Sequence, residues 1–240
     1  MEIKGSKGKL YLLPSPLSES PVENVLPAYV LEVIRGLRYF IVEELRTARR
    51  FLKKAHPGID LNQVEFFVFN EHSKEEPPAS SLQPLHSGHD MGLLSEAGLP
   101  CIADPGSGIV SLAHRSGITV VPLTGPSSLF LALMASGFPG QNFAFRGYLP
   151  VEKNERARRI RELESLAGKD DQVQIFIETP YRNLQVFDAL IANCRPSTLL
   201  CIASELTGAE EQVILKPIGE WKKILPNIHR KPAVFLLYHE

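Results

Sequence analysis

The stretch Met91–Val110 reads "MGLLSEAGLPCIADPGSGIV", and it interrupts apolar sequence with an unusual density of glycine and proline. The run Met91–Leu94 has the length and composition of a buried strand. The glycines after Ser95 permit positive φ and close backbone approach, and the prolines stiffen the turns. A helix is expected to begin near Ser107, so the loop lies where open α/β sheets bind ligands. A tight structural turn with a helix cap has the same composition, and both interpretations stay open here.

A second loop of the same kind follows in "LTGPSS" (Leu123–Ser128). It ends a strand predicted over Thr119–Leu123 and opens a helix predicted over residues 128–136. The Gly125-Pro126 turn exposes backbone amides, and the hydroxyls of Ser127 and Ser128 either cap the helix or donate to a ligand. Capping is the simpler interpretation for one serine. Two such loops on successive strands of one sheet favour a ligand crevice.

Short apolar runs alternate with helical patterns along the chain, which predicts an α/β fold with a parallel-rich sheet. Strands are expected at Leu10–Leu13, Tyr39–Glu43, Glu65–Phe69, 91–95, Thr119–Leu123, Gln174–Glu178, Leu199–Ser204, Gln212–Leu215 and Ala233–Tyr238. Helices are expected at 26–34, 46–55, 128–136, 154–168, 182–194 and 218–225. Consecutive strands in the second half favour a mixed sheet there.

The Pro/Gly punctuation predicts an N-terminal domain of residues 1–123 and a C-terminal domain of residues 124–240. The segment 140–154 is interpreted as a junction, and the polar stretch 72–90 as a surface loop or short helix. Within that stretch, His86, His89 and Asp90 suggest a metal site only weakly, because no second ligand cluster accompanies them. No metal is therefore expected.

The composition is that of a soluble globular protein, with 240 residues, 44% of them hydrophobic and 22% charged. A net charge of −1 gives no global basic field, so RNA contact would need a local patch. The helix "RTARRFLKK" is the best such patch, although charge runs are usually solvated faces. Three cysteines without ligand spacing predict reduced core thiols. With no leader or membrane span recognisable, the protein is expected to be cytoplasmic.

The segments "SEAGLP", "ADPG", "TGPSS" and "FAFRGYLP" follow one another along the chain. In this order they resemble the motifs of the tetrapyrrole methylase superfamily, and within it the branch that methylates a ribose 2′-hydroxyl of small-subunit ribosomal RNA. That branch carries Ser-Asp-Ala-Gly-Thr-Pro, Asp-Pro-Gly, Pro-Gly-Pro-Ser-Ala and Phe-x-Gly-Phe-Leu-Pro. Further matches are "LLPSPL", "EELRTARRFL", "NEHSKEE", "FIETPYRNL" and "ASELTGAEEQV", so the resemblance covers about residues 9 to 239.

The resemblance implies two α/β domains with S-adenosyl-L-methionine in a cleft between them, in a homodimer. The implied cofactor contacts are Pro14, Ser95, Glu96, Ala97, Pro100, Ser127, Ser128, Glu178 and Leu206. The chain departs from the branch in its first loop, which lacks the usual glycine and is longer, and in Glu96, which replaces an aspartate. The first departure bears on the methyl acceptor more than on the cofactor.

Methyl transfer to a hydroxyl benefits from a general base, and four side chains are candidates. They are Glu44, Glu71, His72 and Glu205, while Arg46 and Arg182 are candidates to hold a phosphate. For each one alone, a salt bridge or structural hydrogen bond is the simpler interpretation. The sequence thus favours a methyltransferase of ribosomal RNA. Two alternatives stay open, a methyltransferase of a tetrapyrrole or other small molecule, and a binding module without turnover.

Overall fold

The structure is a computed structural model that describes residues 6–69 and 79–239. The chain divides into two compact units, Met1–Pro126 and Ser127–Glu240, here called the N-terminal unit and the C-terminal unit. The boundary predicted after Leu123 lies in the same loop as this division. Within the described ranges, no helix combines the length and apolarity that crossing a membrane requires.

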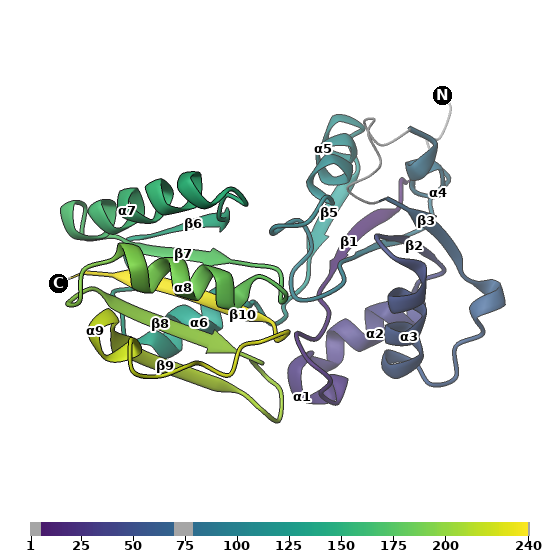
Figure 1. Ribbon diagram of the computed structural model, residues 1–240. Helices are drawn as coiled ribbons and strands as arrows, with labels where there is room; N and C mark the ends of the chain where they lie inside the picture. The colour runs from purple at the N-terminus through teal and green to yellow at the C-terminus, as the bar shows by residue number, and fades with distance from the viewer. Residues whose placement is uncertain (1–5, 70–78, 240) are drawn as a thin grey trace. The chain divides into compact units, whose positions relative to one another are not determined.

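The N-terminal unit is built on one parallel sheet (Figure 1). In the described part of this unit its five strands follow the order β3-β2-β4-β1-β5. They are β1 (Lys9–Leu13), β2 (Tyr39–Val42), β3 (Glu65–Val68), β4 (Met91–Leu94) and β5 (Thr119–Pro122). Each neighbouring pair is parallel, so all five carboxyl ends lie at one edge.

Helices bury both faces of this sheet, which explains why its strands are short continuous apolar runs. On one face, α2 (Ala28–Gly36) and α3 (Leu45–Ala55) pack with Phe40 and Val42. On the other, α5 (Ser107–Arg115) packs with Ile41, together with residues around α4. The shorter elements are α1 (Val22–Val25), η1 (Leu61–Gln63), η2 (Ala79–Leu82) and α4 (Gln83–His86).

The connections reverse direction at the centre of the sheet. From β1 through β2 to β3 the chain crosses the face covered by α2 and α3, and from β3 through β4 to β5 it crosses the opposite face. A change of face with each change of direction keeps every crossover of the same hand. The neighbours β2 and β4 therefore send their following loops to opposite faces. This is a topological switch point, where open sheets bind ligands.

The C-terminal unit is built on a mixed sheet with the strand order β6-β7-β10-β8-β9 in its described part (Figure 1). The strands are β6 (Phe143–Tyr148), β7 (Val173–Ile177), β8 (Leu199–Ser204), β9 (Gln212–Pro217) and β10 (Ala233–Tyr238). Among the described strands of this unit, β6 and β7 pair in parallel and the other three pairings are antiparallel. The helices are α6 (Ser128–Ser136), α7 (Lys153–Lys169), α8 (Asn183–Asn193) and α9 (Ile218–Trp221). The prediction of a mixed sheet in the second half is confirmed.

The interpretation of residues 140–154 as a junction is wrong, because Phe143–Tyr148 forms the edge strand β6. Arg146 and Gly147 interrupt its apolar pattern and hid the strand. The Arg146 guanidinium donates from Nε to Gln174 Oε1 at 2.8 Å, which satisfies the cation on the sheet. Gly147, at φ 66°, lies where the register with β7 shifts. A bulge of this kind is a regular feature of edge strands.

The polar stretch 72–90 contains a short helix, as the prediction allowed. Its helix α4 buries Leu85 completely in the core, so this part is more than a surface loop. Asp90 Oδ1 accepts the backbone N–H of Lys9 at 2.7 Å, and the His89 ring lies 5.4 Å from that of Tyr39. Within residues 6–69 and 79–239, no three potential metal ligands gather in one place.

The three cysteines are free thiols. Burial raises the pKa of Cys194 and of Cys201 to about 12. Cys101 is half-buried, and its desolvation together with the neighbouring Asp104 raises its pKa to about 11. At neutral pH all three are therefore protonated and poor nucleophiles.

Candidate functional site

The loops that follow β1 and β4 are tied together directly after the strands end. The backbone N–H of Ser15 donates to Gly98 O at 2.9 Å, and the N–H of Gly98 donates back to Ser15 O at 3.1 Å. The hydroxyl of Ser15 donates to Ser95 O at 2.8 Å, and both serines are buried. The backbone N–H and C=O groups of Ser15 and Gly98 are thus paired with each other at this edge of the sheet.

The loop after β5 joins this arrangement through close packing. A Cβ at Gly125 would lie 2.1 Å from Cβ of Pro14, so only glycine fits against the proline ring. Gly98 has φ +76°, and a Cβ there would lie 3.6 Å from Pro126 O. The segments around Gly98 and Gly125 are therefore adjacent, which the prediction of a common site requires.

The loop from β4 to α5 holds two L-residues in left-handed backbone. Cys101 has φ 69° and Ala103 has φ 60°. Each such residue costs about 1–3 kcal/mol, and such strain is concentrated at functional sites. Pro100 is buried in this loop, whereas Glu96 and Ala97 are exposed. The carboxylate of Asp104 accepts the N–H of Gly106 at 3.0 Å, and α5 begins directly afterwards at Ser107 as predicted.

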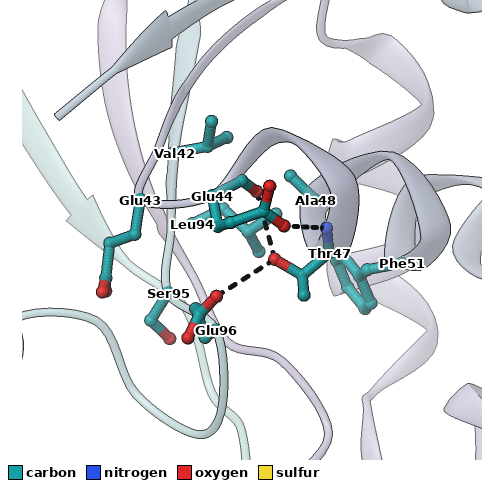
Figure 2. A pocket seen from close by; sticks show the side chains of 9 residues that line it. All are labelled: Val42, Glu43, Glu44, Thr47, Ala48, Phe51, Leu94, Ser95 and Glu96. Carbon is teal, nitrogen blue, oxygen red and sulfur yellow. Dashed lines mark hydrogen bonds between the residues drawn. The ribbon is translucent and has the colours of Figure 1, made fainter. Parts of the chain in front are cut away.

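A small pocket opens at the switch point between the ends of β2 and β4 (Figure 2). Its apolar floor comes from the last residues of the two strands and from α3. Its rim is polar and carries three carboxylates and two hydroxyls. The lining residues are Val42, Glu43, Glu44, Thr47, Ala48, Phe51, Leu94, Ser95 and Glu96.

Thr47 connects the two sides of this pocket (Figure 2). Its hydroxyl lies 3.2 Å from Glu96 Oε1 and 3.1 Å from Glu44 O, and these two acceptors share its single proton. Among the described residues the Glu96 carboxylate has no other hydrogen-bond donor. An exposed carboxylate with one oxygen already held can accept a hydrogen bond from a hydroxyl or amino group of a ligand.

Glu44 is the N-cap of α3. Its Oε1 accepts the N–H of Arg46 at 2.9 Å and its Oε2 accepts the N–H of Thr47 at 2.7 Å. These two backbone hydrogen bonds hold the pKa of Glu44 below its ordinary value. A carboxylate with a lowered pKa is a weaker base. The structure thus gives Glu44 a capping function, and its role as a base stays a prediction.

The basic face of α3 is partly neutralised within the N-terminal unit. Lys54 Nζ lies 2.6 Å from a carboxylate oxygen of Glu19, and Arg50 lies 3.9 Å from the same carboxylate. The Arg49 guanidinium lies 5.5 Å from the centre of the Phe66 ring. Arg46 and Lys53 are exposed. The helix predicted to contact RNA therefore offers less free charge than its sequence suggests.

The C-terminal unit carries further predicted residues at the edge where β7 and β8 end. Both strands are antiparallel to β10, so their carboxyl ends lie on the same side. Glu178 follows β7 with its side chain fully buried. Its Oε1 accepts the N–H of Thr179 at 2.7 Å, while its Oε2 lies 3.1 Å from Arg182 but has no aligned hydrogen bond. A buried carboxylate oxygen in this state has capacity for a further donor.

Leu206 follows β8 and is buried, between two residues in left-handed backbone. Glu205 has φ 53° and Thr207 has φ 66°. Ser127 occupies the N-cap position of α6 without a capping hydrogen bond from its side chain, so the interpretation of its hydroxyl as a cap is wrong. Ser128 is the first residue of that helix. Glu71 and His72 lie outside the described residues.

Two residues that sequence reasoning did not select are important here. Ser15 closes the bridge between two loops, and Thr47 connects Glu96 to the start of α3. The position of Thr47 in "EELRT", three residues after an N-cap glutamate, was the available signal. Nothing in the sequence indicated that Glu96 would lie opposite it.

Several curated proteins are similar in sequence to this chain over most of its length. "Ribosomal RNA small subunit methyltransferase I" of Escherichia coli O157:H7 is 30% identical over 235 residues, which is 97% of this chain and 78% of that protein. The protein of the same name from Leptospira biflexa is 28% identical over 242 residues, 100% of this chain and 94% of that protein.

Solved structures share the fold. The methyltransferase CobJ superposes with a TM-score of 0.63 at 14% identity, covering 97% of this chain and 100% of that one. Uroporphyrin-III-C-methyltransferase from Thermus thermophilus gives a TM-score of 0.58 at 17% identity, covering 97% and 94%. A family model described as "Tetrapyrrole (Corrin/Porphyrin) Methylases" matches residues 28–222. Because this match spans well over half of the sequence, the chain belongs to the tetrapyrrole methylase family.

Proposed function

We propose that the protein is an S-adenosyl-L-methionine-dependent methyltransferase of small-subunit ribosomal RNA, and that its methyl acceptor is a ribose 2′-hydroxyl. The observation that carries the proposal is the near full-length similarity to proteins named ribosomal RNA small subunit methyltransferase I. The RNA substrate is taken from those names, and the 2′-hydroxyl from the motif order in the sequence. A homodimer is proposed from the resemblance to the superfamily, and a cytoplasmic location from the composition of the sequence.

The cofactor supplies a methyl group bound to a positively charged sulfur, together with a carboxylate and ribose hydroxyls. The proposed contacts are Pro14, Ser95, Glu96, Ala97 and Pro100 in the N-terminal unit, and Ser127, Ser128, Glu178 and Leu206 in the C-terminal unit. Two observations support this set. Oε2 of the buried Glu178 has no aligned hydrogen bond and can accept one from a hydroxyl of the cofactor. The N–H groups in the first turn of α6 have no side-chain cap and can donate to the carboxylate of the cofactor.

The main contribution of the protein in such a transfer is alignment of donor and acceptor, which supplies about 7–11 kcal/mol when the geometry is near attack. The tied loops of the N-terminal unit are suited to this because backbone hydrogen bonds and glycine contacts fix them. A general base adds roughly 10²–10⁴-fold. Glu71, His72 and Glu205 remain proposed for this role, with Glu44 weakened by its capping bonds. Arg46 and Arg182 remain proposed phosphate contacts, although Arg182 is also paired with Glu178.

Transfer of a radiolabelled methyl group tests the proposal directly. The protein is incubated with labelled cofactor and either small ribosomal subunits, free small-subunit RNA or a precorrin-type tetrapyrrole. Label in the RNA, followed by loss of alkaline cleavage at one nucleotide, is the expected result, because a methylated 2′-hydroxyl cannot attack the adjacent phosphate. Label only in the tetrapyrrole would overturn the RNA substrate. Tight cofactor binding by calorimetry with no transfer to any acceptor would overturn the enzymatic assignment and favour a binding module.

A further inference from the structure

An exposed aromatic ring lies beside a cation at the β7 edge of the C-terminal unit. Tyr181, in the loop between β7 and α8, is 76% exposed. The guanidinium carbon of Arg230, in the segment leading to β10, lies 5.7 Å from the centre of the Tyr181 ring. This separation is within the range of a cation–π contact. The two segments, one leaving β7 and one entering β10, can be followed in Figure 1.

The fold fixes both partners through their backbones. The N–H of Arg230 donates to Pro180 O at 3.1 Å, directly next to Tyr181. Arg230 has φ 58°, an unfavourable conformation that the surrounding structure must hold. Asn183, which is fully buried, donates from Nδ2 to Lys231 O at 2.6 Å. The ring and the cation are thus presented on two loops that are joined to each other.

Arg230 differs from two neighbouring cations in its partners. Arg182 is paired with Glu178 at 3.1 Å, and Lys231 with Glu210 at 2.7 Å. Among the described residues, no carboxylate forms an ion pair with Arg230. From Lys222 to Lys231 the sequence contains four lysines and arginines, one histidine and no acidic residue. Arg230, beside the Tyr181 ring, therefore belongs to a locally basic segment that the near-neutral net charge conceals.

We propose that Tyr181 and Arg230 form a stacking platform for one unpaired base of the RNA substrate, and this inference rests on the proposed function. One side of the ring is approached by the guanidinium, and its 76% exposure leaves surface for a nucleobase. Unpaired bases stack on aromatic and guanidinium planes in proteins that bind single-stranded RNA. The cation also attracts the phosphates that flank the base.

Tyr181 lies in the same loop as Glu178, a proposed cofactor contact, and follows it by three residues. Residues Glu178 to Arg182 therefore carry a proposed contact to the cofactor, Glu178, and two to the nucleic acid, Tyr181 and Arg182. A base held here would be positioned by the loop that also positions Glu178. This makes the ring a positioning group for the acceptor strand, and it assigns no step of the chemistry to Tyr181.

The test compares binding of a short fluorescein-labelled single-stranded oligoribonucleotide of mixed sequence with binding of an abasic oligonucleotide of the same length. Fluorescence anisotropy gives the affinity of each for the wild-type protein, Tyr181→Ala and Tyr181→Phe. Loss of base stacking predicts about 5- to 150-fold weaker binding of the base-containing strand by Tyr181→Ala. Binding of the abasic strand is expected to stay unchanged, and Tyr181→Phe is expected to retain wild-type affinity for both.

Tyr29→Ala is the matched control, because Tyr29 is also a well exposed tyrosine, at 59%, and lies in the other unit. Arg230→Asn removes the cation with a residue that tolerates left-handed backbone, and should weaken both strands. Equal affinity of Tyr181→Ala and wild type for the base-containing strand would overturn the platform. So would an equal loss for both strands, which would indicate a contact with something other than a base.

The methyl-transfer assay separates failure of the platform from failure of the proposed function. A wild-type protein that labels ribosomal RNA, with a Tyr181→Ala variant that binds RNA normally, would overturn the platform alone. A wild-type protein that binds cofactor but neither binds nor labels RNA would overturn the proposed function and the platform with it. Cofactor affinity of Tyr181→Ala, measured by calorimetry, should equal that of wild type and shows that the variant is folded.

Discussion

The two units hold their strand-end loops together in different ways. In the N-terminal unit two backbone hydrogen bonds join Ser15 to Gly98, and the backbone of Gly125 packs against the Pro14 ring. In the C-terminal unit a buried ion pair is added to backbone hydrogen bonds such as that from the N–H of Arg230 to Pro180 O. Arg182 lies within 3.1 Å of the buried Glu178 and donates to Pro150 O at 3.3 Å. Backbone ties tolerate most changes of side chain, whereas side-chain ties are lost with one residue.

Side chains of the C-terminal unit also hold the segment between β6 and α7. Arg156 donates to Pro150 O at 3.2 Å and to Val151 O at 2.8 Å, so two arginines hold the carbonyls of this segment. Both guanidinium groups have an Nε that is buried without a hydrogen bond. A buried charged network of this kind has large consequences when one member is removed. We therefore expect single substitutions to destabilise the strand-end loops of the C-terminal unit more than those of the N-terminal unit.

The largest effect is expected for Glu178→Gln. This change leaves Arg182 without its buried counter-charge, and the loss is expected to be about 3 kcal/mol of unfolding free energy, at the low end for buried pairs because Arg182 is 21% exposed. Chemical denaturation of the purified protein measures it. Glu220→Gln is the control, since its pair with Lys216 at 3.4 Å is on the surface and contributes little. Equal effects of the two changes would show that the side-chain tie does not stabilise this edge.

The next effect is expected for Gly125→Ala, which tests the backbone tie. The added Cβ overlaps the rigid Pro14 ring, and overpacking of this kind costs about 1–3 kcal/mol. The cofactor affinity is expected to fall as well, because Pro14 is a proposed contact. Denaturation and calorimetry measure the two effects. Gly140→Ala is the matched control, because a Cβ there meets no atom within 4 Å. A Gly125→Ala variant as stable as this control would contradict the close packing.

The smallest effect is expected for Glu44→Ala and depends on pH. Backbone hydrogen bonds lower the pKa of Glu44, so its stabilising contribution is present above the ordinary value of 4.5 and is lost as the pH falls through the lower folded value. The variant should therefore melt at a lower temperature than wild type at neutral pH, and the difference should shrink in acid.

Glu44→Asn keeps a capping side chain but carries no titratable group. At neutral pH its melting temperature should be closer to that of wild type than the melting temperature of Glu44→Ala is. Because asparagine does not titrate, its capping contribution should not be lost in acid. Thermal unfolding followed by circular dichroism across the pH range measures both variants. A difference between wild type and Glu44→Ala that stayed constant from neutral pH into acid would contradict the capping role of the ionised carboxylate.

Much of the N-terminal unit could be predicted from the sequence because local patterns decide it. The apolar runs ending at Leu13 and Leu94 are strands, and the Gly/Pro loops after them lie at one edge, as parallel strands require. The edge strand β6 was missed, because the partners of Arg146 are distant in sequence: Gln174 in the neighbouring strand and Gln172 just before it. Of the proposed site residues, Glu178 was selected by resemblance, while its pairing with Arg182 became known only from the structure.

The sequence by itself determined the α/β class, the loops that end the strands of the first sheet and the order of motifs that indicates a methylase. These properties depend on residue type and spacing over short distances, where propensity, periodicity and turn chemistry act. Only the tertiary structure decided which loops touch, which charges are neutralised and which are left free, as for Arg50 beside Glu19 and Arg230 beside Tyr181. Such partners are far apart in the chain, and only the folding of the sheet edges brings them together.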